Sequence, residues 1–312
     1  MNDLISIIIP TKNEENNIKI CLEAILKQKT QANIEIIIID SGSTDDTVGV
    51  IKEFKIKEKQ NIKLFEILSE DFGHGKTRNM GAGLANGDYL VFLNADAIPV
   101  DENWLSQLIN GFDKEINIAG VFSRHLPKEN CHLYMVRDLK KSMPPVSYVR
   151  NRKKTLEYML FSTVSCMIPK EIWNKYPFQD NIIIAEDQYW AGQILKNNLK
   201  IGYQANSLVY HSHNYSTKEM YDVKYKVSKS SEDFNSKIPA ITLGLFLVIS
   251  GMTIKILGDI GFIFSRDNNS LSIRQKFVEL RIALKARFAG FSGKYVGWIS
   301  KKDNEANRQR GK

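Results

Sequence analysis

The sequence predicts an α/β fold with a mostly parallel central sheet that is flanked by helices. Residues 36–39 are four consecutive isoleucines, which is typical of a strand buried on both faces, as strands of parallel sheets are. A second apolar run covers residues 4–10 and a third covers residues 88–94, with helical patterns between the runs. The order strand, polar loop, helix, strand indicates a βαβ unit.

The strand at residues 36–40 ends in an acidic residue, Asp40, and a small polar turn follows it. Asp45 and Asp46 then open a helix, where acidic side chains suit the positive end of the helix dipole. A carboxylate at the carboxyl end of a parallel strand lies at the crevice where open α/β sheets bind ligands. Gly42 allows a nucleotide to approach the backbone. We therefore predict a nucleotide site that includes Asp40, Ser41 and Gly42, with a plain turn as the alternative.

The strand at residues 4–10 leads into a second polar motif, PTKNE at residues 10–14. Together with DSGSTD at residues 40–45, this motif resembles the Pro-(Thr/Ala)-x-Asn-Glu and Asp-x-Gly-Ser-Thr-Asp segments of the family 2 glycosyltransferases. The resemblance extends over residues 4–215 and implies the GT-A fold, with Asp40 contacting the nucleoside of a nucleotide-sugar donor. The donor site implied by the first motif consists of Pro10, Thr11, Asn13 and Glu14.

Residues 71–82, DFGHGKTRNMGA, place two glycines around a histidine and two cations at the start of a predicted helix. Backbone amides at a helix start, together with cations, can hold a diphosphate. The segment is similar to a rhamnosyltransferase-like branch of the family, and the predicted donor contacts are His74, Gly75, Lys76 and Arg78. A solvated helix start is the alternative. The glycines at residues 81–87 do not indicate a dinucleotide site, because Asn86 stands where the third glycine belongs.

The strand at residues 88–94 ends in Asn94-Ala95-Asp96, where glycosyltransferases of this fold carry Asp-x-Asp. The resemblance implies that a carboxylate here binds a divalent cation that bridges the donor phosphates. Mg²⁺ and Mn²⁺ prefer such oxygen ligands, so Asp96 is the predicted metal ligand. Asn94 is neutral and is interpreted as a contact to the donor sugar or the ribose, with Ala95 beside it. The alternative for Asp96 is a cap on the following helix.

Glu186 and Asp187 precede a helical run that ends near residue 198. Paired acidic residues at a helix start can simply suit the helix dipole. The resemblance implies instead that Asp187 is the general base of an inverting transfer, with Glu186 as a helper or a structural group. Such a base takes the proton of the acceptor hydroxyl while that hydroxyl attacks the anomeric carbon. Trp190, one turn further on, is interpreted as an acceptor contact that stacks on a sugar face, or as a core residue.

A pair of histidines, His211 and His213, follows a short apolar run at residues 208–210. Residues at i and i+2 of an extended segment face the same side, so both imidazoles can face one site. The resemblance implies that a histidine here completes the metal site, and His211 is the predicted ligand, with His213 as a further candidate. The alternative is a structural role, such as a hydrogen bond from His213 to a backbone carbonyl.

Charge divides the chain into a neutral part and a basic tail. Residues 265–312 contain 12 Lys or Arg and 4 Asp or Glu, a net charge of +8 that equals the charge of all 312 residues. Residues 238–254 carry no charge, and residues 272–288 are helical in pattern and basic. We expect a catalytic domain at residues 1–236 and, at residues 237–312, an apolar then basic helical region that attaches to an anionic membrane surface. A homo-oligomer contact is the alternative, and nucleic-acid binding is not expected because it does not explain the apolar run.

Three widely spaced cysteines, Cys21, Cys131 and Cys166, form no disulfide framework or metal spacing, which indicates a reducing compartment. We therefore expect the protein at the cytoplasmic face of the cell membrane, peripheral or shallowly inserted. The resemblance implies an inverting, metal-dependent hexosyltransferase that uses dTDP-rhamnose or a UDP-hexose. Its expected acceptor is a cell-surface polysaccharide or a lipid-linked glycan. The alternative function is a non-catalytic relative that binds nucleotide-sugar or glycan within an assembly complex.

Overall fold

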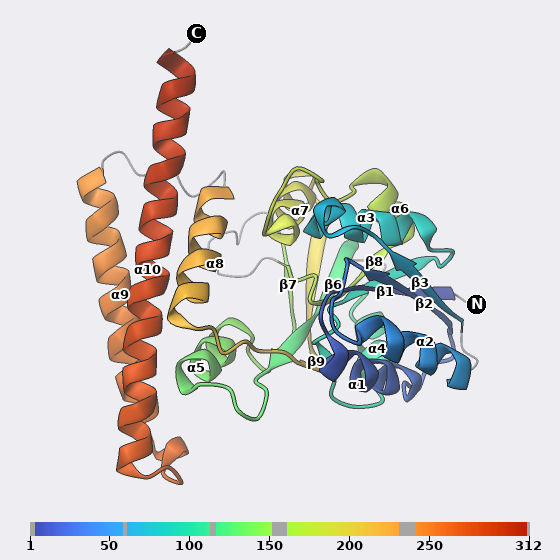
Figure 1. Cartoon of the computed structure of the whole chain (residues 1–312), viewed down its shortest axis with the longest axis horizontal. Helices are drawn as coiled ribbons and strands as arrows, with labels where there is room; N and C mark the ends of the chain where they lie inside the picture. Colours follow the sequence, from blue (N-terminus) through green and yellow to red (C-terminus); the bar gives the residue numbers. More distant parts are fainter. Residues whose placement is uncertain (1–3, 59–60, 113–116, 152–160, 231–240, 311–312) are drawn as a thin grey trace. The chain divides into compact units, whose positions relative to one another are not determined.

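A computed structural model of the chain describes residues 4–58, 61–112, 117–151, 161–230 and 241–310 (Figure 1). The chain divides into two compact units. The sheet unit consists of Met1–Leu126 and Ser142–His211, and the helical unit consists of Pro127–Lys141 and Ser212–Lys312. The predicted domain boundary between residues 236 and 237 lies outside the described residues.

Within the described residues, the sheet unit is built on a nine-stranded sheet in which eight strands follow the order β3-β2-β1-β4-β8-β6-β9-β5, and β7 pairs with β9. The strands are β1 (Leu4–Thr11), β2 (Asn33–Asp40), β3 (Ile62–Glu66), β4 (Tyr89–Leu93), β5 (Ile98–Pro99), β6 (Ile118–Leu126), β7 (Tyr148–Arg150), β8 (Ser165–Pro169) and β9 (Lys200–Tyr210). Strands β1 to β4 pair in parallel, whereas β8 is antiparallel to both β4 and β6. The predicted α/β class is confirmed, and the second half of the sheet is mixed.

Helices cover both faces of the sheet (Figure 1). One face packs against α1 (Glu15–Leu26), α2 (Thr47–Glu58) and α4 (Trp104–Asn110). The other packs against α3 (His74–Leu84), α6 (Lys170–Lys175) and α7 (Glu186–Lys196). The isoleucines of β2 alternate between these faces, because Ile36 and Ile38 join the first core and Ile37 and Ile39 join the second. This explains why the strand has no polar face.

The parallel strands bring the predicted polar motifs to one edge of the sheet. Thr11 at the end of β1 lies in register with Asp40 at the end of β2. β4 pairs with the other side of β1, and the loop directly after β4 carries Asp96. Since parallel strands end at the same edge, three loops with polar residues meet there.

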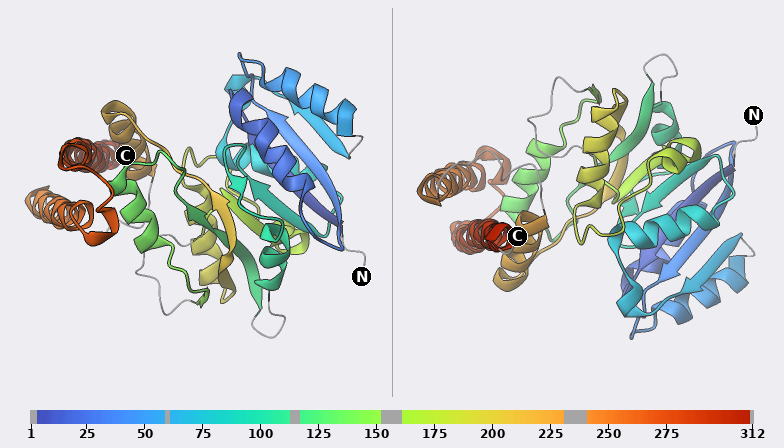
Figure 2. Two further views of the ribbon diagram at one scale, coloured as in Figure 1. Left: turned by 90° about the horizontal axis from the view of Figure 1, so that it is seen from below. Right: turned by 90° about the horizontal axis from the view of Figure 1, so that it is seen from above.

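The helical unit contains α5 (Leu133–Ser142, whose last residue belongs to the sheet unit), α8 (Thr217–Ser230), α9 (Ile241–Ile263), the short helix η3 (Arg266–Asn268) and α10 (Ile273–Arg310). Helices α9 and α10 run side by side, and α10 also packs along α8 (Figures 1 and 2). Small residues on α10 permit its close contact with α8, since a Cβ on Gly293 would lie 2.3 Å from the carbonyl oxygen of Tyr221. In the part of the chain that the structure describes, no helix has the length and apolar character of a membrane span.

Candidate active site

The loops after β1 and β2 interlock through hydrogen bonds. Asp40 Oδ1 accepts the backbone N–H groups of Gly42, at 3.0 Å, and Ser43, at 2.9 Å, which fixes the turn. The backbone N–H of Asn13 donates to Ser43 Oγ at 2.8 Å, and Asn13 Oδ1 accepts the N–H of Thr44 at 2.8 Å. Asn13 has a positive φ of 54°, which asparagine tolerates better than most residues. The two predicted motifs therefore form one polar ledge.

Gly42 is required by this ledge for two reasons. Its φ is +76°, in the left-handed region that disfavours residues with a Cβ. A Cβ at this position would also lie 2.6 Å from Ser69 Oγ. Ser69 cannot easily move away, because its hydroxyl donates to the carbonyl oxygen of Ser41 at 3.0 Å and accepts from Lys12 Nζ at 2.9 Å.

Two hydroxyl groups on the ledge have no hydrogen-bond partner among the described residues. They are Oγ1 of Thr11, the last residue of β1, and Oγ of Ser41, the first residue after β2. Both residues are buried, and burying an unsatisfied hydroxyl is costly unless a ligand or water completes it. Pro10 lies in register with Ile39 of β2, and the backbone N–H of Glu14 donates to Thr47 Oγ1 at 2.7 Å, so these two residues belong to the same ledge.

Helix α3 begins at His74 and carries the other predicted donor contacts. Burial lowers the pKa of His74; the charge of Glu186 opposes this shift and that of Arg78 reinforces it. Gly75 lies against the backbone of Gln179, where a Cβ would approach the carbonyl oxygen to 2.6 Å. Lys76 is exposed, and its Nζ lies 3.1 Å from Asp71 Oδ1.

Arg78 is buried and connects three elements. Its Nη1 donates to Glu186 Oε1, at 3.0 Å, and to the carbonyl oxygen of His74, at 3.1 Å, while Nη2 donates to Asn94 Oδ1 at 2.8 Å. Glu186 Oε1 also accepts the hydroxyl of Thr163 at 3.1 Å. Arg78 thus joins the start of α3, the tip of β4 and the start of α7. Arg78 Nε has no hydrogen-bond partner among the described residues.

The tip of β4 is held by its own backbone and by Arg78. The N–H of Asn94 donates to the carbonyl oxygen of Val164 at 2.9 Å, and its side-chain oxygen is engaged by Arg78. Ala95 is buried in the core of the first sheet face. Of the three predicted residues at this tip, Asp96 is the one that lies against a histidine.

Asp187 lies beside Glu186 at the first turn of α7. Its Oδ1 accepts the N–H of Gln188 at 2.7 Å, and Oδ2 accepts the N–H of Thr163 at 3.4 Å. Burial and the negative charge of Glu186 raise the pKa of Asp187 to about 6, against the opposing charge of Arg78. A carboxylate in this range can take up and release a proton near neutral pH.

Asp96 and His211 face each other across the sheet edge. Asp96 Oδ2 lies 3.6 Å from His211 Nε2, and the two side chains are 11% and 12% exposed. His213, the further candidate, follows two residues after His211 and belongs to the helical unit. A carboxylate oxygen with imidazole nitrogens is a donor set that suits Mn²⁺ and related divalent ions.

A further histidine, His125 of β6, supports His211. The two rings meet edge to face, with 5.4 Å between their centroids and 73° between their planes. Burial, and next the neighbouring His211, lower the pKa of His125 well below its usual value, so the ring is neutral. No sequence motif points to His125, because it is a lone histidine within a strand. The pairing arises only when β6 and β9 become neighbours.

The interpretation of Trp190 as an acceptor contact is corrected by its position. Its side chain is fully buried, packs against the rings of Phe161 and Phe178, and donates its indole N–H to the carbonyl oxygen of Tyr176 at 2.8 Å. A sugar cannot stack on a ring whose faces are covered. Trp190 belongs to the core between α7 and the sheet.

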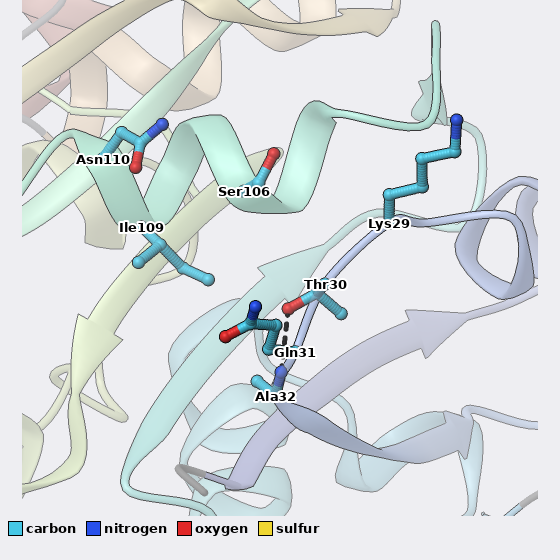
Figure 3. A pocket seen from close by; sticks show the side chains of 7 residues that line it. All are labelled: Lys29, Thr30, Gln31, Ala32, Ser106, Ile109 and Asn110. Carbon is cyan, nitrogen blue, oxygen red and sulfur yellow. Dashed lines mark hydrogen bonds between the residues drawn. The ribbon is translucent and has the colours of Figure 1, made fainter. Parts of the chain in front are cut away.

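A surface hollow lies away from these residues (Figure 3). Residues 29–32, which precede β2, line it together with Ser106, Ile109 and Asn110 of α4. The Thr30 hydroxyl accepts the backbone N–H of Ala32 at 3.1 Å. Because this hollow lies at the amino end of β2, it is separate from the edge where Asp40 lies.

Residues 6–176 match the family model described as glycosyl transferase family 2. The O-antigen chain rhamnosyltransferase RfbN of Salmonella typhimurium is 32% identical over 69% of this chain and 68% of its own length. The O-antigen chain rhamnosyltransferase WbaN of Salmonella anatum is 29% identical over 63% of this chain and 62% of its own length.

Solved structures share the fold at low sequence identity. The mannosyltransferase PcManGT from Pyrobaculum calidifontis, in complex with GDP-Man and Mn²⁺, is 14% identical with a TM-score of 0.58, covering 95% of this chain and 86% of that chain. Residues 1–349 of S. aureus TarS are 18% identical with a TM-score of 0.55, covering 96% and 91%. At these identities the similarity is one of fold.

Proposed function

Because the chain belongs to glycosyl transferase family 2, we propose that it transfers a sugar with inversion from a nucleotide-diphospho-sugar to a glycan acceptor, with Asp187 as general base. The predicted family, GT-A fold and enzyme class are confirmed by the family match and by the similarity to TarS. The alternative of a non-catalytic relative is set aside, since the relatives that match over most of the chain are transferases.

The observation that carries the proposal is the environment of Asp187. The carboxylate of Glu186 beside it is held by Arg78, and burial with the charge of Glu186 raises the pKa of Asp187 to about 6. In the proposed step, an Asp187 carboxylate oxygen takes the proton of the acceptor hydroxyl as the hydroxyl oxygen bonds to the anomeric carbon. The bond from that carbon to the diphosphate oxygen breaks on the opposite face, and the nucleoside diphosphate leaves with the electron pair.

The donor is proposed to bind along the ledge formed by the loops after β1 and β2. Asp40 is the proposed contact to the nucleoside. The hydroxyls of Thr11 and Ser41, which lack a hydrogen-bond partner among the residues that the structure describes, are available to the same ligand. Lys76 is the proposed cation for the diphosphate because its side chain is exposed. Arg78 is better assigned to positioning Glu186 and Asn94, since its Nη atoms are engaged by protein acceptors.

Asp96 and His211, with His213 as a further candidate, are the proposed ligands of Mg²⁺ or Mn²⁺. Their carboxylate and imidazole atoms fit a divalent ion, and PcManGT, which shares the fold, was solved with Mn²⁺. When bound, the ion would stabilise the negative charge of the diphosphate leaving group. The neutral ring of His125 would keep His211 oriented toward Asp96.

The proposed donor is activated rhamnose, as dTDP-rhamnose, and the proposed acceptor is a cell-surface polysaccharide or a lipid-linked glycan. The names of RfbN and WbaN, both O-antigen chain rhamnosyltransferases, support this choice. A UDP-hexose is the second candidate donor, since TarS was solved with UDP-GlcNAc.

Calorimetric titration of dTDP-rhamnose, UDP-glucose, UDP-galactose and GDP-mannose, each with and without Mn²⁺, tests the donor and the metal together. We expect one metal-dependent binder, dTDP-rhamnose. Asp187→Asn provides the matched control, because it should bind the donor as the wild type does yet lose transfer by at least about a hundredfold. Near wild-type turnover by a folded, donor-binding Asp187→Asn would show that Asp187 is not the base. Tight binding of another donor would show that the donor is not dTDP-rhamnose.

A further inference from the structure

Helix α9 of the helical unit exposes most of its large apolar side chains on one side and turns its charged side chains inward. An ordinary surface helix buries its apolar stripe. In α9, Asp259 is only 1% exposed, whereas Phe246 is 67%, Ile254 is 66% and Leu257 is 63% exposed. Lys255 is also turned inward, with 27% of its side chain exposed. This inversion leaves a broad apolar face on the outside of the helix.

Buried ion pairs fix the helix in this orientation. Asp259 accepts three charge-assisted hydrogen bonds, from Arg287 Nε at 2.7 Å, from Arg287 Nη2 at 2.9 Å and from Arg137 Nη1 at 2.8 Å. Asp138 of α5 accepts from Lys255 Nζ and from Arg287 Nη1, both at 2.7 Å. Turning α9 to bury its apolar face would pull Lys255 and Asp259 away from these partners, which is costly for buried charges.

Helix α10 extends the apolar face. Four of its exposed apolar residues follow one another at intervals of four, seven and four positions, which keeps them on one side of a helix: Ile273, Phe277, Leu284 and Phe288. At the turn between the helices, the ring of Phe264 meets that of Phe277 edge to face with 5.8 Å between centroids. We define the apolar face as the exposed large apolar residues between positions 246 and 264, in α9 and directly after it, together with this row on α10.

Cations border the apolar face. Arg274, Arg281 and Lys285 of α10 are exposed, and at about 100° per residue they follow directly beside the row of Ile273 and Phe277 around the helix. Among the described residues 245–300, Asp267 is the one acidic residue in the exposed class. The face is therefore apolar with a positive border, and its complement is apolar with negative charge.

We propose that the apolar face of α9 and α10 docks on the surface of a lipid bilayer that contains anionic lipids. Aromatic and aliphatic side chains would enter the boundary between head groups and acyl chains, while Arg274, Arg281 and Lys285 bind lipid phosphates. A second copy of the chain fits less well. A two-fold interface would place the positive border of one copy against that of the other. The proposal does not depend on which sugar the enzyme transfers.

Sedimentation of the full chain with vesicles of phosphatidylcholine, with and without phosphatidylglycerol, tests this proposal. We expect binding to the vesicles that contain phosphatidylglycerol, with a strong decrease at high salt. Replacing Phe277 and Phe288 together by Glu should weaken binding by roughly tenfold or more. Ile56→Glu, on α2 of the sheet unit, is the matched control, because Ile56 is 79% exposed and lies outside the apolar face.

A second variant guards against a folding defect. Arg274, Arg281 and Lys285 replaced together by Gln are all surface changes, so helicity by circular dichroism should stay that of the wild type while the preference for phosphatidylglycerol is lost. Equal binding by the wild type and both variants overturns the proposal, as does absence of binding to either vesicle. It is also overturned if the wild type is a dimer in light scattering that the Phe277 and Phe288 replacements convert to a monomer.

Discussion

As the proposed general base, Asp187 should determine how the reaction responds to pH. Its pKa is raised from 3.8 to about 6, first by burial and second by Glu186, and a general base works only when deprotonated. We expect kcat/KM to rise by about tenfold per pH unit below about pH 6 and to level off above it. Glu186→Gln removes a charge that raises this pKa, so the acidic limb should move to lower pH. A limb that stays in place would refute the assignment.

The raised pKa of Asp187 also determines whether this residue raises or lowers the free energy of unfolding. The folded-state pKa of Asp187 lies above the unfolded value, so the ionised carboxylate costs folding free energy, and this cost appears as pH rises through about 6. Asp187→Asn should therefore resist urea better than the wild type at about pH 8, by roughly 1–3 kcal/mol, and match it near pH 4. This control separates loss of the base from loss of the fold.

The elements bring together proposed metal ligands that are far apart in the sequence. Asp96 follows β4 and His211 follows β9, two strands that are separated by β8 and β6 in the sheet. His211→Ala should weaken Mn²⁺ binding by at least about tenfold, since even changes in the groups behind metal ligands often cost that much. His132→Ala is the control, because His132 pairs with Glu279 in the helical unit. Unchanged Mn²⁺ affinity of His211→Ala, measured by calorimetry, would remove His211 from the site.

Local patterns were sufficient to predict β1, β2, β4 and the polar loops that follow β1 and β2. A buried parallel strand is an unbroken apolar run, and the first polar residues mark its end. The strand and the candidate site residues after it are therefore neighbours in the sequence. The bracing between these loops was not predictable, because the hydrogen bond from Asn13 to Ser43 joins residues 30 positions apart. The same applies to Arg78, whose partner Glu186 is 108 positions away.

The second half of the sheet and the role of Trp190 could not be predicted from local sequence patterns either. β5 has two residues and β7 has three, and such short strands carry no periodic signal. A tryptophan near the proposed catalytic residues at a helix start is compatible with a contact to a sugar or with a place in the core. Only the packing of α7 on the sheet, with Phe161 and Phe178 around the ring, distinguishes the two.

In the molecule as a whole, the helical unit depends on charges that are buried within it. Asp259→Ala should destabilise this unit by about 3–5 kcal/mol, because Arg287 and Arg137 would lose their shared acceptor. Hydrogen exchange of the α9 and α10 amides would report the loss directly. Asp267→Ala, at an exposed position in η3, is the control and should change stability by less than about 0.5 kcal/mol. Equal protection in both variants would show that the buried ion pairs are not needed.

The division of the helical unit between two stretches of sequence affects how the chain can fold as it is synthesised. Arg137 and Asp138 of α5 are made long before their partners, since Asp138 is 149 positions from Arg287. A growing chain therefore holds these two charges without their final partners while β7 to β9 are added. A fragment ending at residue 236 would remain in that state permanently. The last helix, α10, thus completes a segment that lies in the middle of the sequence.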